Sequence, residues 1–130
     1  APLMEENGWK GARKWAQGAQ SIAPTLVGGS KKHGGPDLGP TRARKAWAQL
    51  GVNGSTLAES APEPSFDGAP RLTVRMAAAI QGFPADWHFV GAKTNAYRQV
   101  GNAFPPPVAQ AVGEQLASAL RAANLQRASA

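Results

Sequence analysis

Residues 105–123 form the longest stretch of helical periodicity in the chain, and they restrict the folds that it can adopt. The apolar side chains of this stretch make one stripe, which consists of Val108, Ala111, Val112, Leu116, Ala119, Leu120 and Ala123. Such a stripe has to be covered by other apolar surface, because packing stabilises a helix more than propensity does. The rest of the sequence contains few strand-like segments that would cover it. We therefore expect a long helix near residues 106–123 that packs against something else.

The turn before this segment combines Gly101 and Asn102 with three consecutive prolines, Pro105 to Pro107. A Gly-Asn pair tolerates positive φ and allows the backbone to approach a ligand closely. Prolines suit the first turn of a helix, where amide hydrogens have no intrahelical partner. Two interpretations stay open: a polar-ligand site at a helix start, or a surface turn that only connects two elements.

The composition indicates one small, loop-rich domain with an anionic partner. Of its 130 residues, 15 are glycine and 11 are proline, and the net charge is +6. An excess of positive charge favours nucleic acid as the partner, with a solvated basic face as the alternative.

The absence of certain residue types excludes several kinds of site from this chain. The chain has no cysteine, which excludes disulfides, cysteine metal sites and a cysteine nucleophile within it. Its two histidines, His33 and His88, lie too far apart for a zinc motif, so we expect no bound metal. No apolar run reaches transmembrane length and no signal peptide is visible, which predicts a soluble intracellular protein without membrane contact.

For residues 1–36 the sequence predicts irregular structure with one short strand. Residues 1–20 lack clear periodicity, and residues 21–27 resemble a strand whose Pro24 favours a sheet edge. Residues 28–36 are a glycine-rich loop with two lysines. That loop would approach phosphates or base edges closely, or it is a plain mobile loop. Residues 52–70 are predicted to be a polar loop or linker.

Two shorter helices are also predicted. The first covers residues 42–50, with Thr41 as its N-cap and Trp47 as a core anchor. The second covers residues 74–81 and has Thr73 as its N-cap.

Two motifs resemble conserved blocks of the DNA (cytosine-5) methyltransferase family. The family's penultimate block is similar to Arg71-Leu72-Thr73-Val74-Arg75 together with Gln81-Gly82-Phe83-Pro84. Its last block is similar to Tyr97-Arg98-Gln99-Val100-Gly101-Asn102-Ala103 with Pro105 and Pro106. The order and spacing of the two motifs also match. Upstream, Thr25-Leu26-Val27 before the glycine-rich loop is similar to the Thr-Leu element of the family's target recognition domain.

These patterns and the resemblance together predict an α+β fold. We expect a small recognition domain of short strands, loops and a few helices, ending in a long helix that docks on a Rossmann-like catalytic domain absent from this chain. Residues 1–70 would belong to the target recognition domain, and residues 71–96 would be the block that organises it. Residues 97–130 would be the last block and the helix that returns to the catalytic domain.

The resemblance implies an enzyme that flips cytosine out of double-stranded DNA and methylates its C5 with S-adenosylmethionine, as in restriction-modification. The family's nucleophile is a cysteine, so this chain alone is expected to be inactive. It would be a C-terminal portion or split subunit that acts with the missing catalytic part in a prokaryotic-type cytoplasm. Pairing with a second copy through the long helix is an alternative. Other functions left open are a standalone basic DNA-binding module and a non-catalytic interaction subunit.

The resemblance also assigns site residues. The cofactor positions are Gly101, Asn102 and Ala103, although we expect this chain alone to bind S-adenosylmethionine weakly or not at all. The candidate DNA contacts are Thr25, Gly28, Gly29, Ser30, Lys31, Lys32, Arg42, Arg44 and Lys45. The structural block comprises Arg71, Thr73, Arg75, Gln81, Gly82 and Pro84. No catalytic residue is expected in the chain.

Two positions of the penultimate block carry specific expectations. Arg75 is expected to be a buried, hydrogen-bonded brace. Met76 stands where the family has glutamate, and this is expected to remove one helix-capping interaction of about 1 kcal/mol.

Overall fold

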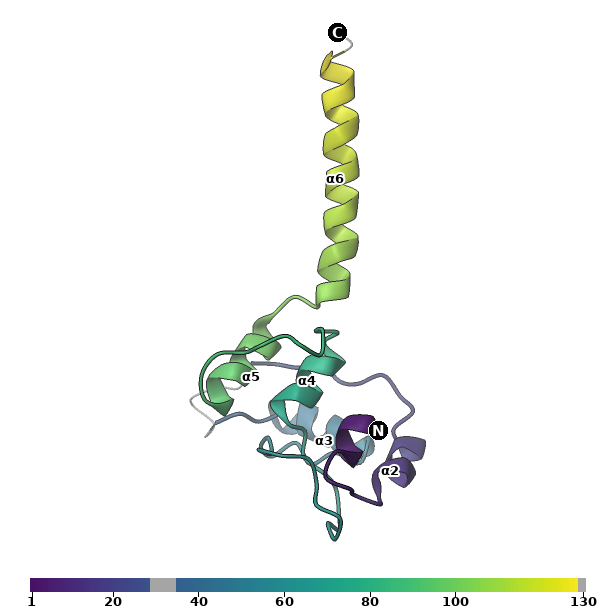
Figure 1. Ribbon diagram of the computed structural model, residues 1–130, viewed down its shortest axis with the longest axis vertical. Coiled ribbons are helices and arrows are strands. Elements are labelled where there is room, and N and C mark those ends of the chain that lie inside the picture. The colour runs from purple at the N-terminus through teal and green to yellow at the C-terminus, as the bar shows by residue number, and fades with distance from the viewer. Residues whose placement is uncertain (29–34, 129–130) are drawn as a thin grey trace.

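A computed structural model of the protein describes residues 1–28 and 35–128, and this part of the chain is built from helices and loops. The helices are α1 (Pro2–Glu5), α2 (Ala12–Gly18), α3 (Thr41–Gln49), α4 (Val74–Ile80), α5 (Lys93–Asn102) and α6 (Pro106–Ala128). Figure 1 shows α1 to α5 gathered with their loops into one body, whereas α6 extends away from it as a single rod.

The predicted α+β fold is wrong, because the described residues contain no strand. Residues 21–27, predicted to be a strand, are irregular. A strand needs a second extended segment to pair with, and the described part of the chain offers none. Pro24 also lacks the amide hydrogen that a sheet ladder requires. The segment is held instead by Leu26, which is buried, while Ile22 is almost fully exposed.

The hydrophobic core lies between α3, α4, α5 and the loops that join them. Trp47 is buried at its centre, as predicted, together with Leu38, Val52, Leu57, Leu72, Met76, Tyr97 and Val100. α3 begins one residue earlier than predicted. Thr41 is its first helical residue, and Pro40 in extended conformation is the N-cap, with no side-chain cap bond. After α3 the chain reverses at Gly51, whose φ of 67° is favourable only for glycine.

The N-terminal 20 residues are more ordered than their sequence predicts. They contain α1 and α2, and two tryptophans hold them against the following loops. The indole Nε1 of Trp9 donates a hydrogen bond to the carbonyl oxygen of Phe66 over 2.9 Å, and that of Trp15 donates to Leu50 over 3.0 Å. Helices this short show no clear periodicity, which is why the sequence did not reveal them.

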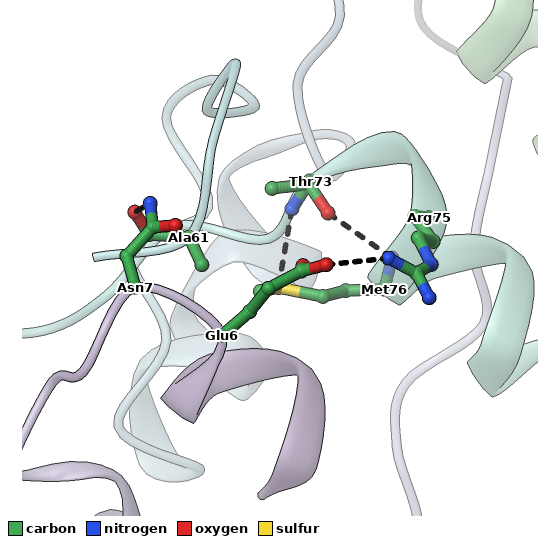
Figure 2. A network of polar contacts seen from close by, with 6 residues as sticks. All are labelled: Glu6, Asn7, Ala61, Thr73, Arg75 and Met76. Carbon is green, nitrogen blue, oxygen red and sulfur yellow. Dashed lines mark hydrogen bonds and ion pairs between the residues drawn. The ribbon is translucent and has the colours of Figure 1, made fainter. Parts of the chain in front are cut away.

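Figure 2 shows how α4 begins and how the N-terminal segment meets it. Thr73 is the N-cap, as predicted: its hydroxyl accepts a hydrogen bond from the amide of Met76 over 3.2 Å. The expected loss of the reciprocal bond is wrong, because the Met76 sulfur accepts from the Thr73 amide over 3.4 Å. The thioether thus takes the place of the glutamate carboxylate in the capping box.

Arg75 also differs from its prediction as a buried brace. Its side chain is 57 % exposed, and it forms an ion pair with Glu6 over 2.6 Å (Figure 2). The first turn of α4 points this residue outward, because Met76, Ala77 and Ala78 occupy the buried face. Arg75 therefore ties α4 to the segment after α1 at the surface of the body.

The long helix α6 is present and reaches further than predicted, to Ala128. Its stripe is not covered by the body. The side chains of Val108 and Val112 are about half exposed, and those of Leu116 and Leu120 are 60 % and 66 % exposed. None of the helices in the described residues is long and apolar enough to cross a membrane.

Candidate functional site

The Gly-Asn motif closes helix α5 and does not form a separate turn. Gly101 and Asn102 are its last two residues, and no residue of the pair has positive φ. α5 forms because Ala96, Tyr97 and Val100 line one buried face that packs on α4 and the core. Ala103 caps the helix in extended conformation, with its amide donating to the carbonyl of Val100 over 3.3 Å. The sequence predicted a turn at Gly101 and Asn102, so helix α5 was not predicted.

Gly101 lies directly against the backbone that leads into the glycine-rich loop. A Cβ built on Gly101 would be 2.5 Å from the nitrogen of Gly28 and 2.7 Å from the carbonyl carbon of Val27. No side chain fits into such a gap, because backbone atoms cannot move aside as a flexible side chain can. Glycine at this position is thus required by contact with another segment of the same chain.

Asn102 lies beside the same segment. A Cβ on Gly28 would overlap the side-chain Oδ1 of Asn102 and stand 3.0 Å from its Cγ. Asn102 as a whole residue is exposed. The structure therefore brings two predicted cofactor residues, Gly101 and Asn102, against one predicted DNA residue, Gly28.

Gln81 connects the two sequence motifs. Its Nε2 donates hydrogen bonds to the carbonyl oxygens of Val100 and Ala103, over 3.2 and 3.5 Å. These carbonyls lie at the end of α5, where the regular pattern of intrahelical hydrogen bonds stops, and the Val100 carbonyl also accepts from the Ala103 amide. The side chain from the end of α4 thus fixes the backbone on both sides of Gly101 and Asn102. The sequence contains no direct signal for the contact between Gln81 and the end of α5, apart from the presence of both motifs in one chain.

Gly82 brings the start of α6 to the same place. Its φ is 81°, and a Cβ built on it would be 2.8 Å from the ring of Pro107. The turn after α4 therefore packs against the first turn of α6. Of the other residues assigned to the structural block, Arg71 and Pro84 are exposed.

The candidate DNA contacts fall into three groups. Arg42, Arg44 and Lys45 are exposed on α3, and none of them forms an ion pair within the described residues. Thr25 is exposed, and Gly28 is partly buried against α5. Gly29, Ser30, Lys31 and Lys32 lie outside the described residues. Arg42, Arg44 and Lys45 therefore lie exposed on one helix without an ion-pair partner among the residues that the structure describes.

Tyr97 anchors the buried face of α5. Burial raises its pKa to about 12, and the negative charge of Asp37 contributes to the shift. Its hydroxyl has no hydrogen-bond partner in the described part of the chain. The side chain is fully buried and neutral at physiological pH, so it serves packing and not proton transfer.

Groups that would hold a metal ion are missing from the described residues, where no three histidine, aspartate or glutamate side chains converge. The chain also has no cysteine. What the end of α5 presents at the surface is the exposed residue Asn102, next to the carbonyls that Gln81 binds.

Comparison with known proteins identifies relatives of the chain. Residues 6–118 match the family described as C-5 cytosine-specific DNA methylase. The chain is 56 % identical to Type II methyltransferase M.NaeI of Lentzea aerocolonigenes over 121 residues, which are 91 % of the chain and 29 % of that protein. It is 49 % identical to Type II methyltransferase M.NgoMIV of Neisseria gonorrhoeae over 125 residues, 94 % of the chain and 39 % of that protein.

A shorter similarity reaches beyond bacteria. DNA (cytosine-5)-methyltransferase 1A of Oryza sativa subsp. japonica is 49 % identical over 51 residues, 39 % of the chain and 3 % of that protein. No solved structure matches the chain. The chain spans about a third of the length of the two bacterial relatives.

Proposed function

Because the chain belongs to the C-5 cytosine-specific DNA methylase family, we propose that it supplies the DNA-recognition and C-terminal part of a DNA cytosine-5 methyltransferase. The two bacterial relatives that align with over nine tenths of it are both named Type II methyltransferases, which supports a role in restriction-modification. The complete enzyme would rotate one cytosine out of duplex DNA and methylate its C5.

The observation that carries this proposal is the rigid presentation of Asn102. Gln81, from the first motif, donates hydrogen bonds to the carbonyls on either side of the Gly101–Asn102 pair, while Asn102 itself is an exposed residue. An exposed amide on a fixed backbone offers one donor group and one acceptor to a polar ligand. This suits the amino-acid end of S-adenosylmethionine, which carries both an ammonium and a carboxylate group.

S-adenosylmethionine would supply the methyl group of the reaction. Asn102 would bind and orient its amino-acid end, and the backbone of Gly101 and Ala103 would line the same surface. Ala103 has no hydroxyl, so it adds no side-chain hydrogen bond. The cysteine nucleophile would come from the catalytic part, because this chain contains none.

The long helix would connect the two parts of the enzyme. Val108, Val112, Leu116 and Leu120 follow one another every four residues along α6 and are uncovered. Their burial against the catalytic part would hold the Asn102 surface at the cofactor. The exposed cations of α3 would contact phosphates of the DNA, since free arginine and lysine side chains pair readily with them.

Reconstitution tests the proposal. This chain and a separately produced catalytic part are assayed alone and mixed, with duplex DNA and S-adenosylmethionine carrying a labelled methyl group. We expect label in the DNA only for the mixture, and none when every cytosine of the DNA is already 5-methylated. Label transfer by this chain alone contradicts the proposal. Salt-sensitive DNA binding by a chain that never activates its partner would indicate a standalone DNA-binding module.

A further inference from the structure

We propose that Gly28 is a positioning residue for the reaction: its bare Cα holds the Asn102 amide in the orientation that binds the cofactor. This inference rests on the proposed function, in which Asn102 contacts S-adenosylmethionine. Gly28 lies in the segment that leads into the glycine-rich loop, far from Asn102 in the sequence. The recognition segment and the cofactor motif would thus meet at Gly28.

The geometry limits where the Asn102 side chain can lie. A Cβ on Gly28 would overlap its Oδ1 and approach Cγ to 3.0 Å and Nδ2 to 3.3 Å. All the polar atoms of the amide therefore lie next to this one Cα. Asn102 is an exposed residue, and no hydrogen bond of its side chain is found within the described residues.

The two backbones at this contact cannot separate to make room. Gly101 lies so close to Gly28 that a Cβ on Gly101 would be 2.5 Å from the Gly28 nitrogen. On the helix side, Gln81 binds the carbonyls of Val100 and Ala103 and fixes the end of α5. A methyl group added at Gly28 therefore has to displace the movable partner, which is the amide at the tip of Asn102.

This asymmetry makes Gly28→Ala an informative variant. An amide at the end of a side chain can rotate to another rotamer at a small cost, so the body should keep its fold. The displaced amide would no longer meet the cofactor. Gly101→Ala would meet backbone atoms instead and would disturb the packing itself. Gly18→Ala is the matched control, because a Cβ there meets nothing within 4 Å.

The test uses steady-state kinetics of the complete methyltransferase carrying each variant. For Gly28→Ala we expect the KM for S-adenosylmethionine to rise about tenfold while kcat and the KM for DNA stay within about twofold, as for a lost ground-state contact. Gly18→Ala should leave all three parameters unchanged. Thermal unfolding of the 130-residue chain reports whether the fold is kept. A large fall in its midpoint, with both KM values raised, would make the contact merely structural and overturn the inference.

A double-mutant cycle separates this inference from the proposed function. Asn102→Ala should raise the KM for S-adenosylmethionine, and adding Gly28→Ala should raise it no further, because the residue that Gly28 positions is gone. If Asn102→Ala raises this KM and Gly28→Ala does not, the positioning role is wrong and the proposed function stands. If Asn102→Ala itself leaves the KM unchanged, the cofactor role of Asn102 fails and the positioning role fails with it.

Discussion

Tyr97 shows how one residue of a sequence motif serves the fold. It is the only tyrosine of the chain, and its side chain is fully buried on the inner face of α5. Burial raises its pKa from 10.0 to about 12, with a further contribution from the charge of Asp37. Because the folded chain keeps its proton where the unfolded chain loses it, folding becomes less favourable as pH rises through this interval.

A spectroscopic titration checks this directly, since the tyrosinate absorbance of the chain comes from Tyr97 alone. The unfolded chain should ionise near pH 10, and the native chain should show no tyrosinate there, in line with a pKa of about 12. Across this interval the free energy of unfolding should fall by about 2–3 kcal/mol through Tyr97. Tyr97→Phe should remove that part of the fall. A native chain that ionises near pH 10 would contradict the assigned burial.

The same variant tests the unpaired hydroxyl. An unsatisfied buried donor costs about 1–3 kcal/mol, and phenylalanine keeps the ring while removing the donor. We therefore expect Tyr97→Phe to be more stable than the native chain at pH 7, by about 1 kcal/mol, in chemical denaturation. A less stable variant would show that the hydroxyl has a partner in solution.

Individual residues were predictable where their role is local. Thr73 as a cap and Trp47 in the core follow from short patterns of neighbouring residues. The roles of Met76 and Arg75 did not follow. A sulfur acceptor is not part of the usual capping box, and the exposure of Arg75 depends on Glu6, which lies far away in the sequence.

At the scale of elements, the two predicted helix starts differ in a measurable way. Thr73 caps α4 through its hydroxyl, whereas Thr41 is the first helical residue of α3 and makes no cap bond. Thr73→Ala should therefore lower the free energy of unfolding by about 1 kcal/mol. Thr41→Ala should change it by less than about 0.5 kcal/mol, as at most surface positions. Urea denaturation of the two variants measures both, and equal losses would show that α3 begins differently.

The two segments that were predicted wrongly have sequence patterns that are compatible with more than one conformation. α5 ends in Gly101 and Asn102, which are turn formers, yet its buried face at Ala96, Tyr97 and Val100 makes it a helix. Residues 21–27 resemble a short strand in sequence but have no strand to pair with in the described body. In both segments tertiary contacts decide the conformation, and local propensity does not.

At the scale of the whole molecule, the sequence revealed both motifs but not how they meet. Their order and spacing supported the family resemblance, and the apolar stripe of residues 108–123 predicted a partner that covers it. The contacts that build the site depend on three glycines that leave no room for a side chain. Gly101 lies against the backbone of Val27 and Gly28, whereas Gly28 lies against the Asn102 amide. Gly82 lies against the ring of Pro107. A glycine in a sequence does not say whether it serves a turn, a positive φ or a close approach, so these contacts required the three-dimensional structure.

The last prediction concerns the exposed stripe of α6. This helix has 23 residues and is about 34 Å long at 1.5 Å per residue. Its first turn packs against Gly82, whereas the apolar stripe further along it is uncovered. Leu116 lies in the middle of the stripe and is 60 % exposed. Leu116→Glu should leave the thermal stability of the isolated chain unchanged, because its side chain contacts little there.

Binding to the catalytic part should respond differently. Loss of one buried leucine contributes about 1.5–3 kcal/mol, so Leu116→Glu should weaken association by about ten- to a hundredfold in titration calorimetry. Ser118→Glu is the control, since it introduces the same charge about 200° around the helix and should have little effect. Equal weakening by both variants would mean that α6 docks through no particular face. If Leu116→Glu instead dissociates a homodimer and leaves catalytic-part binding intact, the stripe covers a second copy of this chain.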